Sequence, residues 1–77
     1  MVDLYTVKAT SLNVRSLPKV EEDNKITSIP QNHVVSKLSA TEGNSWWRIL
    51  TIKDEQPLEG YVASHFLVLQ GLSKLTI

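Results

Sequence analysis

The side chains that most often do chemistry in proteins are sparse in this chain. It has two histidines, His33 and His65, and no cysteine, and neither histidine lies at ligand spacing from a second metal-binding residue. A zinc site brings three or four such ligands together, so the pattern predicts no metal. Serines are present, but no nucleophile elbow or oxyanion turn accompanies them. We therefore expect a protein that is not an enzyme and that needs no cofactor.

Five side chains are the candidates for binding a ligand: Arg15, Trp46, Arg48, Tyr61 and Phe66. An exposed tryptophan anchors a ligand well because its ring buries a large area and keeps an N–H donor. Trp46 and Trp47 are adjacent in a predicted strand, where neighbouring side chains point to opposite faces. One of the two is therefore expected in the core and the other on the surface. Tyr61 and Phe66 either pack within the fold or edge a groove.

The two arginines leave two interpretations open. The planar guanidinium groups of Arg15 and Arg48 are shaped to clamp a carboxylate, such as a peptide C-terminus. Alternatively, they form surface ion pairs with the acidic residues at 21–23, and such pairs are individually worth little.

The elements that position these side chains are predicted from short β-prone runs separated by turn signals. Strands are expected at 4–10, with the apolar face continuing at 12 and 14, and at 26–29, 33–39, 45–52, 58–63 and 67–69. Loops are expected at 19–25, 41–45 and 53–57, a turn with Asn32 left-handed at 31–32, and one 3₁₀ turn at 64–66. This is an all-β pattern of five to six short antiparallel strands, typical of a small β-barrel over residues 1–70. Residues 71–77 are expected to be an extension or the start of a linker.

Length and charge exclude several functional classes. The 77 residues allow one domain, and eight basic residues are balanced by eight acidic ones. Such a balance does not favour nucleic acid or anionic lipid as a partner. No apolar run approaches the roughly 18 residues of a membrane span, and the first ten residues do not have the pattern of a signal peptide. Two locations stay open: the cytoplasm, or the cell envelope or exterior if the chain is part of a longer secreted precursor.

Three sequence blocks in order carry a family resemblance: LNVRSLP at 12–18, WWRI at 46–49 and GYVASHFL at 60–67, with a short I-to-P turn at 26–30 between the first two. Over residues 5–69 the chain resembles bacterial Src-homology-3-like (SH3-like) domains of the SH3b type. The resemblance implies an SH3-like β-barrel that acts as a non-catalytic binding module. It also places Trp47 on the core side with Ile49, and Trp46 on the outer side with Arg48.

The resemblance implies a partner class as well. SH3-like domains of this kind are attached to envelope proteins, so peptidoglycan or a cell-wall peptide is the expected ligand. The alternative is a protein-interaction or structural module of a larger protein, for which the apolar residues Leu72, Leu75 and Ile77 would supply contacts.

The chain departs from the related patterns at three informative positions. Eukaryotic signalling SH3 domains have proline and tyrosine where Ala63 and Phe66 stand here, so a polyproline ligand is not expected. Leu17 occupies a position that is usually glycine; a glycine there would supply a positive φ, which leucine adopts only at a cost.

Overall fold

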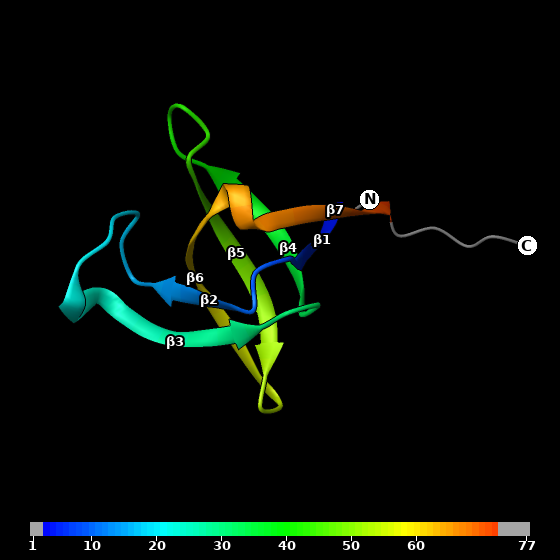
Figure 1. The fold of residues 1–77 in the computed structure, drawn as a ribbon, viewed down its shortest axis with the longest axis horizontal. Coiled ribbons are helices and arrows are strands. Elements are labelled where there is room, and N and C mark those ends of the chain that lie inside the picture. Colours follow the sequence, from blue (N-terminus) through cyan, green and yellow to red (C-terminus); the bar gives the residue numbers. More distant parts are fainter. Residues whose placement is uncertain (1–2, 73–77) are drawn as a thin grey trace, which may run out of the picture.

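Seven antiparallel strands form a single curled sheet in the computed structural model, which describes residues 3–72 (Figure 1). The elements are β1 (Asp3–Val7), β2 (Ser11–Arg15), the 3₁₀ turn η1 (Glu22–Asn24), β3 (Lys25–Pro30), β4 (Val34–Ala40), β5 (Trp46–Lys53), β6 (Gln56–Ala63), the 3₁₀ turn η2 (Ser64–Phe66) and β7 (Leu67–Leu72). The strand order is β3-β2-β6-β5-β4-β1-β7. The predicted all-β antiparallel architecture and the 3₁₀ turn at 64–66 are confirmed.

The first predicted strand is two strands in the structure, which raises the total from the expected five or six to seven. The chain turns a corner between Val7 and Ser11, where the Lys8 N–H donates to Phe66 O and the Asn32 N–H to Val7 O. β1 pairs with β4 and β7, whereas β2 pairs with β3 and β6. The apolar alternation changes phase here, from odd positions up to Ala9 to even positions from Leu12, and this break in the period of two is the sequence signal that the prediction of one continuous apolar face overlooked.

The core lies inside the curl of the sheet and receives apolar side chains from all seven strands. Its fully buried members include Val7, Val14, Ile29 and Ile49. Because β2 and β3 cross in front of β5 (Figure 1), side chains from strands that are far apart in the strand order pack against one another in the core. This closure gives a domain of only 77 residues one continuous core.

Strand β5 alternates as predicted. Trp47, Ile49 and Thr51 are buried, while the side chains of Trp46 and Arg48 point away from the core. The Trp47 ring meets Tyr5 edge-on at a centroid distance of 4.6 Å, and the Lys37 ammonium lies 4.3 Å from its centroid. Offset aromatic and cation–π contacts of this kind stabilise a large ring at the edge of a core. The assignment of Trp47 to the core side is therefore confirmed.

The hairpin between β5 and β6 is tighter than the predicted five-residue loop. Asp54 and Glu55 form a two-residue turn with φ of 53° and 65°, closed by the pair Lys53 and Gln56. Two consecutive left-handed residues are typical of a type I′ turn, whose twist matches that of the strands. Pro57 lies inside β6, next to the turn, where β2 does not pair with this strand. A proline is tolerated there because no second neighbour needs its missing N–H.

Two turn positions differ in their backbone conformation. Asn32 has φ of 71°, as expected for the turn before β4. Leu17 is not among the described residues with positive φ, so it does not incur the cost that this conformation would carry for leucine. The loop that follows β2 takes its shape from side-chain hydrogen bonds and therefore needs no strained residue at this position.

The C-terminal strand extends further than predicted. β7 runs to Leu72 and pairs with β1 up to Asp3. Leu75 and Ile77, the other apolar residues of the expected extension, lie outside the described residues. Among residues 3–72, no helix is long and apolar enough to cross a membrane.

Candidate ligand-binding groove

A groove of about 300 Å³ lies between η2 and the loop of residues 16–24. We call it the Trp46 groove, and its lining includes Asn13, Arg15, Val20, Trp46, Ala63 and Phe66. The loop supplies one wall, η2 supplies the other, and outward-facing side chains of β2, β5 and β6 form the floor. The groove has the mixture of apolar surface and few polar groups that is typical of a ligand site.

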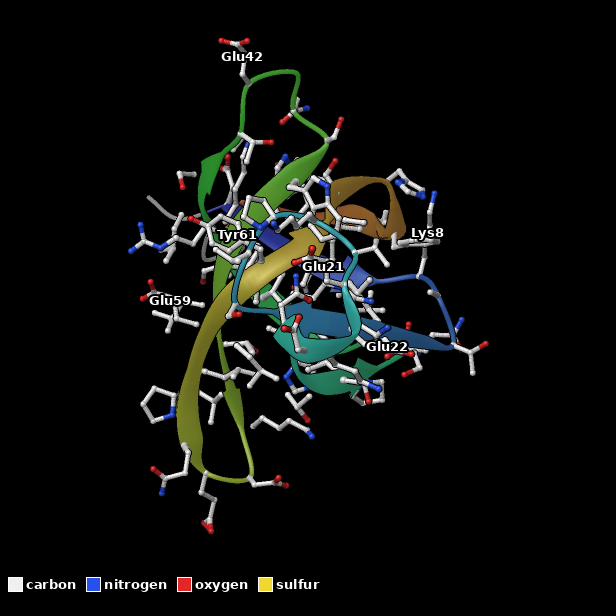
Figure 2. The ribbon with its side chains drawn as sticks, turned by 90° about the vertical axis from the view of Figure 1, so that its left-hand side faces the viewer. Lys8, Glu21, Glu22, Glu42, Glu59 and Tyr61 are labelled. Carbon is white, nitrogen blue, oxygen red and sulfur yellow. The ribbon has the colours of Figure 1, made fainter. Side chains whose placement is uncertain are left out.

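The register of the sheet explains why the candidate side chains gather here. Trp46 pairs with Ala63, and Tyr61 pairs with Arg48 on one side and Arg15 on the other. Paired residues of adjacent strands point to the same face of a sheet. Two neighbouring rows of outward side chains therefore cross β2, β6 and β5, and Figure 2 shows Tyr61 on this face, between Glu59 and the loop that carries Glu21.

Three of the five predicted site residues line the groove and two lie beside it. Arg15, Trp46 and Phe66 contribute to the lining, whereas Tyr61 and Arg48 occupy the adjacent row. Trp46 is half-buried, and 36% of Phe66 is exposed. The structure thus brings the predicted aromatic anchors Trp46 and Phe66 to one hollow although they are far apart in sequence.

Five of the eight lining residues were not among the predicted site residues, and Val20 is the most exposed apolar side chain of those five. It is 74% exposed, the highest value among the large apolar residues of the described chain, and it lies on the loop wall of the groove. The available signal was a lone apolar residue in a charged loop. Such a residue has no place in a core pattern, so periodicity gives it no role.

Arg15 holds the loop wall in place. Its Nη1 donates to the carbonyl oxygen of Glu21 at 2.7 Å and to Oδ1 of Asn24 at 2.9 Å. Asn24 is buried and donates in turn from Nδ2 to Lys19 O at 2.9 Å, while the Ser16 N–H donates to Asn24 O at 2.8 Å. The arginine therefore binds the loop through a backbone carbonyl and an amide instead of pairing with the carboxylates at 21–23.

Arg48 makes a different contact. Its Nε donates to Oε2 of Glu59 at 2.6 Å, and both side chains are close to half exposed. An exposed ion pair of this kind contributes only about 0–1 kcal/mol. Arg48, which was predicted to bind a carboxylate of the ligand, is therefore paired with a carboxylate of the protein itself.

The opposite wall is tied to the hairpin loop at 41–45. The Ser64 hydroxyl donates to Asn44 O at 2.6 Å, and the Ser64 N–H donates to Ser45 O at 2.9 Å. Asn44 also accepts, through Oδ1, the indole N–H of Trp47 at 2.6 Å. A nearly buried indole needs such a partner, so one asparagine links the core, the hairpin loop and η2.

Neither histidine has a metal-like environment in the described part of the chain. His33 Nε2 lies 2.9 Å from Thr51 Oγ1 and 3.1 Å from Ile52 O. Because the Thr51 hydroxyl donates to Val34 O, the hydrogen-bond network assigns the proton to His33 Nε2. His65 stacks on Phe66 with centroids 4.0 Å apart. No group of three possible ligands gathers among residues 3–72.

Comparison with known proteins supports the interpretation of the fold. Neither the curated proteins nor the solved structures returned a match. A family model described as a bacterial SH3 domain matches residues 10–68, a span that contains both walls and the floor of the Trp46 groove. Domains of this family are a binding-module type and are generally not catalytic. On this match over most of its length, the chain belongs to the bacterial SH3 domain family.

Proposed function

We propose that this domain is a non-catalytic targeting module that holds a cell-wall peptide, free or within peptidoglycan, in the Trp46 groove. The observation that carries the proposal is the convergence of Trp46, Phe66 and Val20 on one hollow. Each keeps part of its apolar surface accessible to a ligand. Exposed apolar groups gathered in a concave site mark binding surfaces more often than scattered ones do.

The construction of the groove favours a short ligand of small residues. A volume of about 300 Å³ is at the lower end of ligand sites, so it accommodates a few small residues and not a long extended chain. Ser11 and Asn13 add polar groups that can hydrogen-bond a peptide backbone. In this proposal Trp46, Phe66 and Val20 contact the ligand, and Arg15 maintains the wall. Tyr61 and Arg48 border the site.

A polyproline peptide is a poorer fit to the same surface. A polyproline helix docks between stacked aromatic rings that are fixed in a row. Here Ala63 lies in the groove floor opposite Trp46, and the β2 positions in the lining are Ser11, Leu12, Asn13 and Arg15, none of them aromatic. The groove therefore offers separate apolar contacts and not a continuous aromatic platform.

The test is a sedimentation assay with purified cell-wall sacculi. We expect the protein to co-sediment, and Trp46→Ala to weaken binding about tenfold or more, because a central aromatic contact typically contributes above 1 kcal/mol. Leu38→Ala is the matched control. It truncates an apolar residue of β4 that is 44% exposed and lies outside the groove. Absence of binding to sacculi from any source, or equal loss in both variants, would contradict the proposal.

A further inference from the structure

A second exposed apolar surface lies away from the Trp46 groove, over β5, β4, β1 and β7. We call it the outer face, and its members are Leu4, Thr6, Val34, Leu50, Ile52 and Val68. The register connects them: Thr6 pairs with both Val34 and Val68, and Ser36 pairs with both Leu4 and Leu50. Paired residues point the same way, so these side chains form two adjoining rows across four strands.

No charged residue interrupts these rows. The nearest carboxylate along the second row belongs to Glu59, which pairs with Leu50 in the register and is already engaged by Arg48. Solvent-facing positions of an antiparallel sheet are normally polar, which gives the usual alternation of the two faces. An uncharged outer face over four strands is therefore a surface that gains stability from being covered.

The outer face contains both a hollow and a protruding side chain. A depression of about 420 Å³ is lined by His33, Val34, Ser36, Leu50 and Ile52, together with the neighbouring backbone. Ile52 is 60% exposed at its border, more than Val34, Leu50 or Val68. A two-fold interface must be self-complementary, because the same patch meets itself. A patch that carries a hollow and a protruding apolar side chain side by side meets that requirement.

Charge does not oppose contact between two copies. The formal net charge of the chain is zero, so two molecules have no long-range repulsion to overcome. Strand β7 forms one end of the strand order and, among the described residues, pairs only with β1. Val68 on this strand is 45% exposed, so the apolar surface continues to the sheet edge, whereas its neighbour Leu69 pairs with Tyr5 and points to the other face.

We infer that the outer face is a homodimer interface, in which the sheets of two copies of this chain pack face to face. This inference goes beyond the proposed function and does not depend on it. Trp46 starts β5 and Ile52 lies near its end, roughly 20 Å further along the strand, so both grooves of the dimer stay open. A dimer with two grooves binds a repeating polymer with avidity.

The test is sedimentation velocity of the whole chain from about 10 μM to about 1 mM. We expect a weak dimer with a dissociation constant of about 0.1–1 mM, because burial of a few partly exposed apolar side chains leaves only a small surplus over the free-energy cost of association. Ile52→Lys should weaken the dimer at least tenfold, and Val34→Lys provides a second variant if the first does not fold. Val20→Lys is the control on the groove side and should leave the dimer intact.

Three results would overturn the inference. The first is a wild-type protein that stays monomeric at 1 mM. This result excludes the dimer both if hydrogen exchange then shows that residues 73–77 protect the outer face and if it shows that the face is open to a different protein. The second is a dimer that Ile52→Lys and Val34→Lys both leave unchanged. The third is a dimer that Val20→Lys disrupts. None of these results bears on binding of cell-wall material to the groove, so the two proposals fail separately.

Discussion

Replacing Asn24 with alanine removes the two side-chain hydrogen bonds that hold the loop 16–24 against β2. The bond from Arg15 Nη1 to Asn24 Oδ1 is charge-assisted, and such bonds contribute about 1.5–3 kcal/mol. The bond from Nδ2 to Lys19 O is neutral and contributes about 0.5–1.5 kcal/mol. Because Arg15 is only part-buried and recovers some hydration, we expect a loss of about 2–3 kcal/mol in the free energy of unfolding.

A loss of this size is easily measured in so small a domain. Each 1 kcal/mol corresponds to about 4–8 °C in melting temperature, so Asn24→Ala should melt roughly 10–20 °C below the wild type. Urea unfolding followed by tryptophan fluorescence gives the free energy directly. The amide of Ser16, which donates to Asn24 O, should also lose protection from hydrogen exchange. A double-mutant cycle with Arg15→Ala should return a coupling above about 1 kcal/mol.

Gln31→Ala is the matched control for this prediction. It removes an amide that also donates to a distant backbone carbonyl, that of Lys8, but from an exposed position. We expect a loss below about 1 kcal/mol for this substitution, because water replaces the bond. If Asn24→Ala costs no more than Gln31→Ala, or if the loop amides keep their protection, Asn24 does not hold the groove wall.

Three further predictions test other parts of the fold. Gly60→Ala should destabilise the domain by about 1–3 kcal/mol in urea unfolding, because the added Cβ would lie 2.6 Å from Val14 Cγ1 in the fully packed core. Unchanged stability would mean that β2 does not pack closely against β6 at this position. Replacing Asp54 and Glu55 together with Asn-Gly should raise the melting temperature, since both positions have positive φ and this pair adopts a type I′ turn at lower cost; a lower melting temperature would exclude that turn. Asn44→Ala should cost about 1–3 kcal/mol by leaving the buried indole N–H without its acceptor, and Asn44→Asp, which keeps an acceptor, should recover part of the loss when both are compared by thermal unfolding.

Much of the fold followed from local patterns. The residues of β5 are nearly all β-formers, and their alternation placed Trp47 inside and Trp46 outside. Asn32 was predicted to be left-handed from its residue type alone. The corner between β1 and β2 was missed although the apolar alternation changes phase between Ala9 and Leu12, and the sequence does not show which strands each half pairs with. The two-residue turn at Asp54 and Glu55 was missed because glutamate, unlike aspartate, asparagine or glycine, is not a residue type that favours positive φ.

The site was predictable in part. The aromatic anchors Trp46 and Phe66 were identified by type, and the sheet register brings them to one groove. The role of Arg15 was not predictable, because its partners are a buried asparagine and a backbone carbonyl of the same loop. Val20 was missed because its position depends on how that loop folds over β2. Hydrogen bonds that close a loop depend on three-dimensional proximity, which a single sequence does not display.

The central claim, that the Trp46 groove binds cell-wall peptides, is tested most directly by an NMR titration of the ¹⁵N-labelled domain with soluble peptidoglycan fragments. Binding predicts saturable shifts of the Trp46 indole N–H and of the backbone amides of Asn13, Val20, Ala63 and Phe66, which line the groove. The resonances of the outer-face backbone amides should not shift when the protein concentration is held constant during the titration. Saturable shifts confined to the outer face, or none at millimolar ligand, would contradict the claim.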